Sequence, residues 1–177
     1  IGEGTRELCA LKKGSTVWVL GPLGNGYDLG GLTEGPGRVM IVGGGVGLAP
    51  FPLLLDDLVQ LKDVGAAGSS TGLTRPQGVG AEAARSQEMI VLVGFCDAGQ
   101  AEGAQWLEGA LFRSEEAGLD VTVETATEDG SIGLKGKVTD LVRKRVRPGD
   151  RLAVCGPRAM ALEIWRICTS LSGVNAW

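Results

Sequence analysis

A cluster of four glycines within five residues constrains the fold of this chain more than any other feature; they are Gly43, Gly44, Gly45 and Gly47. A short apolar run, Val39 to Val42, precedes the cluster, and Pro50 with an apolar run of helical spacing follows it. Glycine lets the backbone approach a ligand without a Cβ in the way, and the start of a helix favours an anion. The stretch therefore predicts a strand, a tight turn and a helix start that binds a diphosphate. The expected backbone contacts come from Gly44, Gly45, Gly47 and Leu48.

The glycine pattern leaves an alternative open. It reads G-x-G-x-x-P, from Gly45 to Pro50, and lacks the third glycine of the commonest dinucleotide fingerprint. A plain strand-to-helix turn in another α/β domain would have the same composition. On this stretch alone, nucleotide binding is only modestly favoured over such a turn.

Strands and helices alternate from the glycine cluster onward, which is typical of a parallel sheet. Further strands are predicted at 89–95, 120–125 and 151–155, and a fifth begins at 174–177. The first predicted helix follows Pro50 and ends near Lys62. Three more are predicted at roughly 104–117, 138–145 and 159–171. The fold class expected is α/β, with a doubly wound parallel sheet.

The remaining segments are expected to lie outside this alternation. Residues 1–30 are predicted to form β structure and turns, with a strand from Thr16 to Leu20, and to be the tail of a β domain whose beginning is absent. Thr33 to Gly37 has the composition of a linker. Residues 65–87 are rich in Gly, Ala and Ser without an apolar period, so they are predicted to be a mobile insertion.

Composition excludes several classes of function. The net charge of −4 offers no basic patch for nucleic acid, and no apolar run approaches the roughly 20 residues that span a bilayer. There is no histidine, which excludes Ser-His-Asp hydrolysis and His-containing zinc sites. The four cysteines stand far apart, so no metal site is predicted. With no signal peptide in this sequence, the expected compartment is the cytoplasm, where the thiols would be free.

Four motifs occur in a fixed order: GPLGNGY at 21–27, GGGVGLAP at 43–50, EDGSIGLKGKVTDL at 128–141 and VCGPRAM at 154–160. Together they resemble the ferredoxin-reductase superfamily, and most closely the electron-transfer subunit of type B dihydroorotate dehydrogenase. The resemblance covers nearly the whole chain apart from 65–87. It implies a ferredoxin-reductase-like NAD-binding domain at 38–177, preceded at 1–32 by the last strands of a flavin-binding β-barrel.

The resemblance also implies a function. In that family electrons pass between NAD(H), FAD, a [2Fe–2S] cluster and a catalytic subunit that oxidises dihydroorotate, in pyrimidine biosynthesis. This sequence lacks most of the barrel and the cluster cysteines. Residues 1–177 alone are therefore expected to hold no cluster, to bind FAD poorly and to lack NADH-dependent reductase activity, while keeping weak NAD binding. The alternatives are a related sulfide dehydrogenase or NAD(P)H–ferredoxin oxidoreductase subunit, or a non-catalytic nucleotide-binding or docking module.

Site residues follow from the same resemblance. Asp97, at the end of a predicted strand, is expected to bind the adenosine ribose, and its surroundings favour NAD over NADP; the alternative is a solvated loop aspartate. Gly156 and Pro157 are expected to flank the nicotinamide, with Cys155 at the nicotinamide–flavin contact or else simply buried at a strand end. Gly2, Gly4 and Thr5 are candidates for the FAD diphosphate, with a frayed chain end as the alternative. Glu128, Asp129 and Ser131 form a loop that could lie near the cofactor, with a solvated face as the favoured alternative.

Overall fold

A parallel sheet forms the centre of the molecule, as a computed structural model shows for residues 2–21, 23, 25–33, 37–64, 88–171 and 173–176. Six strands pair in the order β4-β3-β2-β1-β5-β6 within these residues, and every pairing is parallel. The strands are β1 (Val39–Gly44), β2 (Glu88–Phe95), β3 (Asp120–Thr127), β4 (Leu134–Lys135), β5 (Arg151–Cys155) and β6 (Asn175–Ala176). The predicted doubly wound α/β fold is confirmed.

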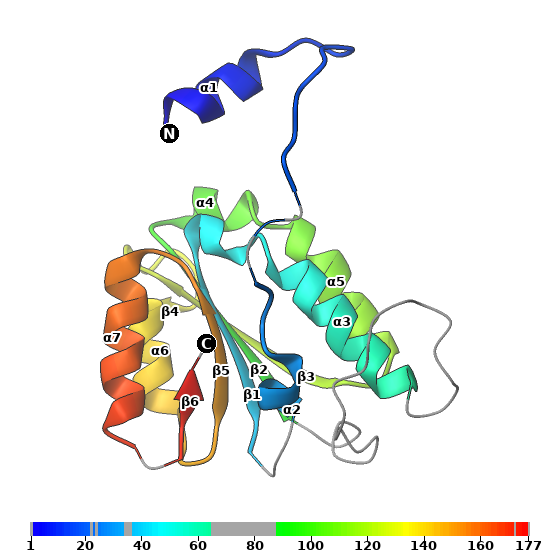
Figure 1. Ribbon diagram of the computed structural model, residues 1–177. Coiled ribbons are helices and arrows are strands. Elements are labelled where there is room, and N and C mark those ends of the chain that lie inside the picture. The colour runs from blue at the N-terminus through cyan, green and yellow to red at the C-terminus, as the bar shows by residue number, and fades with distance from the viewer. Residues whose placement is uncertain are drawn as a thin grey trace.

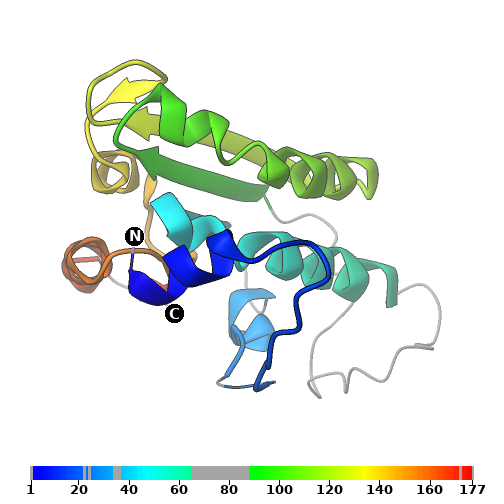
Figure 2. The ribbon, with the colours of Figure 1, turned by 90° about the horizontal axis from the view of Figure 1, so that it is seen from above.

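The helices lie mainly in two layers, one on each face of the sheet (Figures 1 and 2). They are α1 (Glu3–Ala10), α2 (Leu29–Thr33), the short 3₁₀ helix η1 (Gly45–Leu48), α3 (Phe51–Val64), α4 (Ala98–Glu102), α5 (Trp106–Glu116), α6 (Val138–Arg145) and α7 (Arg158–Thr169). Helices α3 and α5 cover one face, and α6 and α7 cover the other. Because both faces are covered, β1 is buried at all six positions and reads as one continuous apolar run.

Alternate residues of β1 pack against the two helix layers. Val39 and Ile41 pack with α3 and α5, whereas Met40 and Val42 pack with α6 and α7. Successive side chains of a strand point to opposite faces of a sheet, so this division follows from the strand's period of two. The two cores are therefore fixed to one another through a single central strand.

Most of the predicted elements are confirmed, and the differences lie at their ends. The helix at 138–145 and the strand at 151–155 have the predicted bounds. Strand β1 continues through Gly44, and η1 separates it from α3, so the long helix does not start directly at the glycines. The helix predicted at 104–117 is α5, at Trp106–Glu116, whereas the short helix α4 before it and the two-residue strand β4 were not predicted.

The strand predicted from Thr16 to Leu20 is wrong. This segment has no regular structure, and the preceding residues form α1, whose residues are all exposed. A strand needs a partner for its backbone hydrogen bonds, and the described residues offer none here. The β-type side chains of the segment lie in solvent instead; Trp18 is 99% exposed and Val19 is 85% exposed.

Two predictions fall on residues outside the described part of the chain. The insertion at 65–87 lies there entirely, and so does the middle of the predicted linker, 34–36. Among the described helices, none combines the length and the apolar character needed to cross a bilayer.

Candidate dinucleotide site

The strand order reverses direction between β1 and β5. The region outside the carboxyl ends of these two strands is called the crevice below. From β1 the chain moves to β2, β3 and β4 on one side, and then returns to β5 on the other side. In open α/β sheets, ligands bind at such a switch point. Gly43 and Cys155 are register partners at this edge, so the glycine turn after β1 and the turn after β5 are neighbours.

The two turns approach so closely that several side chains are excluded. A Cβ on Gly47 would stand 2.5 Å from the carbonyl carbon of Cys155 and 2.5 Å from Cα of Gly156. On Gly44 it would stand 2.7 Å from Sδ of Met160, and on Gly156 it would stand 2.5 Å from Cε of that residue. Each distance is below what real Cβ atoms show. Gly47 therefore allows the two backbones to meet, whereas Gly44 and Gly156 face the flexible end of the Met160 side chain.

Gly45 has a different role from its neighbours. Its φ is +53°, in the left-handed region that glycine adopts at little cost, and an added Cβ would meet nothing within 4 Å. The next residue, Val46, is 90% exposed. This side of the turn is open, so a ligand can approach the backbone of Gly45 and Val46 there.

The end of the glycine turn joins it to the core. Leu48 is fully buried, and its side chain fills the space that a Cβ on Gly43 would need. Only the backbone of Leu48 can therefore serve a ligand. Pro50 accepts a hydrogen bond from Leu54 N at 3.2 Å through its carbonyl, which begins α3. The core thus holds the turn rigidly from one side.

Tyr27 also reaches the crevice, and the sequence analysis missed it as a site residue. Its side chain lies beside that of Cys155, and its ring lies 6.4 Å from the Phe51 ring, centroid to centroid, at a tilt of 40°. Burial, followed by the proximity of Cys155, raises the pKa of Tyr27 to about 12. The motif at 21–27 contained the residue, but nothing in the sequence said which strand end it contacts.

Asp97 caps a helix in this structure. Its Oδ1 accepts a hydrogen bond from Gln100 N at 2.9 Å, which makes it the N-cap of α4. In turn, Gln100 Oε1 accepts from Cys96 N at 3.2 Å. Asp97 is exposed after β2, at the predicted edge of the sheet. Asp97 is thus a solvated aspartate that also caps a helix, and its contact with the ribose stays a prediction.

The acidic loop after β3 lies beside Asp97. Glu128 N donates to the carbonyl of Phe95 at 3.1 Å, and Asp129 N donates to the carbonyl of Cys96 at 3.2 Å. The carboxylate of Asp129 accepts from both the backbone N and the hydroxyl of Ser131, and these hydrogen bonds lower its pKa. The carboxylates of Asp97, Glu128 and Asp129 thus lie near one another at the carboxyl ends of β2 and β3.

The other predicted site residues are not brought to the crevice. Gly2, Gly4 and Thr5 lie at the first turn of α1, which stands away from the sheet (Figure 1). The cysteines fall on separate segments: Cys9 on α1, Cys96 after β2, Cys155 on β5 and Cys168 on α7. Among the described residues, no group of three Cys, Asp or Glu side chains is placed to hold a metal ion.

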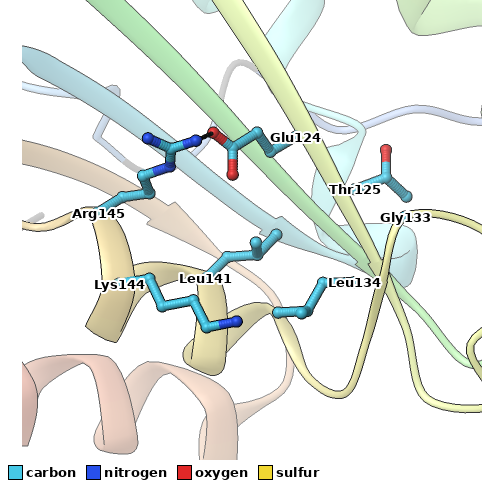
Figure 3. Close-up of a pocket in the computed structure, with 7 residues that line it drawn as sticks. All are labelled: Glu124, Thr125, Gly133, Leu134, Leu141, Lys144 and Arg145. Carbon is cyan, nitrogen blue, oxygen red and sulfur yellow. Dashed lines mark ion pairs between the residues drawn. The ribbon is translucent and has the colours of Figure 1, made fainter.

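A cavity of about 650 Å³ lies elsewhere, between α6 and strands β3 and β4 (Figure 3). Arg145 and Glu124 form an ion pair at its edge, and Lys144 extends along it. It contains none of the predicted site residues. The cavity is open and is lined in part by the apolar side chains of Leu134 and Leu141. It lies at the edge of the sheet formed by β4, away from the switch point.

Relatives of known name match most of the chain. The "Dihydroorotate dehydrogenase B (NAD(+)), electron transfer subunit" of Listeria monocytogenes serovar 1/2a is 32% identical over 159 residues, 90% of this chain and 49% of that protein. The subunits of the same name from Bacillus caldolyticus and Caldanaerobacter subterraneus are 31% and 32% identical and are covered to 48% and 50%. The chain spans about half the length of these curated relatives. No protein-family model matches it.

Solved structures show the same fold at low sequence identity. The cytochrome b5 reductase domain of Ulva prolifera nitrate reductase superposes with a TM-score of 0.62 at 19% identity, over 99% of this chain and 64% of that one. Flavohemoglobin from Malassezia yamatoensis gives 0.57 at 14% identity, over 86% and 34%. The chain therefore shares its fold with these reductase structures and is similar, over about half their length, to the electron transfer subunits of dihydroorotate dehydrogenase B.

Proposed function

We propose that this chain is the NAD-binding part of an electron-transfer subunit that passes electrons between NAD(H) and FAD. One observation carries the proposal: the glycine turn after β1 meets the Gly156–Pro157 turn after β5 at the switch point of the sheet. That juxtaposition provides an open backbone turn for a diphosphate and a second turn beside it for the nicotinamide. The homology to the subunits named above supports the same function.

Each residue has a proposed role in this site. Backbone groups of Gly44, Gly45, Gly47 and Leu48 bind the diphosphate, and Asp97 accepts hydrogen bonds from the adenosine ribose. Gly156 and Pro157 line the nicotinamide, with Cys155 at its contact with the flavin. The fit rests on the open side of Gly45, which leaves room for the diphosphate, and on the exposed position of Asp97 at the strand ends.

We propose that residues 1–32 belong to a flavin-binding β-barrel and that 38–177 are the NAD-binding domain. Gly2, at the N-cap of α1, has no side chain to cap the helix, so the first turn can hold the FAD diphosphate together with Gly4 and Thr5. The exposed Trp18 and its neighbours would be covered by further strands. FAD supplies the isoalloxazine that exchanges a hydride with the nicotinamide when both are bound.

The activity of the whole protein is proposed by homology. A catalytic subunit of dihydroorotate dehydrogenase type is the expected partner, and a [2Fe–2S] cluster is expected only in the full-length protein. The expected compartment is the cytoplasm. A flavin and iron assay on the full-length gene product, purified with any co-purifying subunit, tests this part of the proposal; a product with neither flavin nor iron would contradict it.

Dinucleotide binding can be tested on the chain itself. A Val46→Asp variant places a carboxylate on the open side of the glycine turn, at a side chain that already lies in solvent. We expect it to weaken NADH binding by about tenfold or more, equivalent to about 1.4 kcal/mol, because it repels the diphosphate. Phe112→Asp adds the same charge to exposed α5 and should leave the affinity unchanged. Absent NADH binding, or equal loss in both variants, would refute the proposed site.

A further inference from the structure

Tyr27 is where the N-terminal segment first packs on the α/β domain. Within the described part of residues 2–28, every other side chain is exposed, whereas Tyr27 is partly buried against the core that includes α3. The backbone before it extends away from the sheet toward α1 (Figure 1). Tyr27 is therefore the first described side chain of the segment to contact the domain, just before α2 packs on the same core.

The two partners of Tyr27 belong to the segments that follow β1 and end β5. Phe51 is the first residue of α3 and follows the glycine turn of β1, and its ring lies 6.4 Å from that of Tyr27. Cys155 is the last residue of β5, and its side chain packs with Tyr27 against the same core. Since β1 and β5 flank the switch point, the phenol lies near the ends of both strands, on the face of the sheet that α3 covers.

We infer that Tyr27 lines the nicotinamide half of the site. Its hydroxyl orients the Cys155 side chain, and the exposed part of its ring faces the nicotinamide. This inference rests on the proposed function. The diphosphate on the glycine turn would leave the nicotinamide next to Cys155 and Gly156, within reach of the phenol. Aromatic rings favour offset or edge contacts with other planar rings, and a ring that is only partly buried has surface left for one.

The composition of the chain offers a direct probe, because Tyr27 is its single tyrosine. A ring-labelled tyrosine therefore gives NMR signals from this residue alone. We expect NADH to shift these signals, and ADP-ribose, which carries the diphosphate but no nicotinamide, to bind while leaving them nearly in place. NADH binding, followed by its own fluorescence, without a shift at Tyr27 would refute this inference alone. A chain that binds no NADH would refute the proposed function as well.

Two pairs of variants separate positioning from folding. Cys155→Ala should shift the signal of the hydroxyl-bearing ring carbon of Tyr27, whereas Cys96→Ala, at an exposed thiol after β2, should not. Tyr27→Ala should weaken NADH binding by about tenfold, near 1.4 kcal/mol, and leave ADP-ribose binding unchanged. Tyr27→Phe retains the ring and should restore most of the NADH affinity. Equal losses for both ligands would assign Tyr27 a purely structural role and overturn the inference.

Discussion

Gly47 lies against the end of β5 so closely that a Cβ on it would stand 2.5 Å from the carbonyl carbon of Cys155. The obstructing atoms belong to the backbone, so they cannot move aside as a flexible side chain would. The glycine turn and the β5 turn are therefore held in one arrangement by the absence of a side chain. The proposed site depends on that arrangement.

Substituting Gly47 should separate the two turns. We expect Gly47→Ala to lower the free energy of unfolding by about 1–3 kcal/mol, as overpacking does in a tight interior, and to weaken NADH binding. Urea unfolding measures the first effect. Gly109→Ala is the matched control: it lies on an exposed part of α5 with only a 3.7 Å contact, and it should stabilise the helix by about 0.5–1 kcal/mol. Equal stability in the two variants would contradict the close approach.

Asp97 should act both as a cap and as a selector between dinucleotides. A 2′-phosphate would place negative charge beside Asp97 and the Glu128–Asp129 loop, so NADPH should bind about tenfold more weakly than NADH. Asp97→Asn retains a good N-cap and should reduce the difference in affinity between NADH and NADPH. Asp97→Ala should reduce it too and should in addition cost about 1 kcal/mol of stability. Equal affinities for NADH and NADPH in the wild-type chain would refute the proposed selectivity.

The amino-terminal ends of β1 and β5 are held together by a buried ion pair between Arg38 and Asp150. Asp150 is 2% exposed and accepts from Nε of Arg38 at 3.1 Å, from its terminal guanidinium nitrogen at 2.8 Å and from Arg147 N at 2.8 Å. Asp150→Ala leaves the guanidinium without its main counter-charge and should cost about 3–5 kcal/mol. Asp56→Ala removes the exposed pair with Arg113 and should cost about 0–1 kcal/mol. Chemical denaturation of both variants tests the difference.

Tyr27 should make stability depend on pH in alkaline solution. Its pKa is raised to about 12 from an ordinary 10.0, chiefly by burial and then by Cys155. Between these values the unfolded chain has lost the phenolic proton while the folded chain retains it, so the free energy of unfolding falls as pH rises. Below about pH 10 the group has no such effect. Tyr27→Phe should reduce this alkaline loss, which urea unfolding at several pH values measures; identical slopes would contradict the assigned environment.

Local patterns in the sequence predicted most of the α/β domain. Apolar runs and helical spacing were sufficient for α6 and β5 because both elements bury a regular face, and burial enforces their period. The same reasoning failed for residues 16–20, whose composition favours a strand but which have no strand beside them among the described residues. It also missed β4, since a two-residue strand has no period to detect.

The candidate site shows the same division. The sequence by itself determined that glycines follow the first strand and that Gly156 and Pro157 follow Cys155, because each turn is built from adjacent residues. Only the tertiary structure decided that these turns meet and that Tyr27 joins them. That decision depends on β5 pairing with β1 rather than with β4, a choice made by side chains distant in sequence as they cover both faces of one sheet.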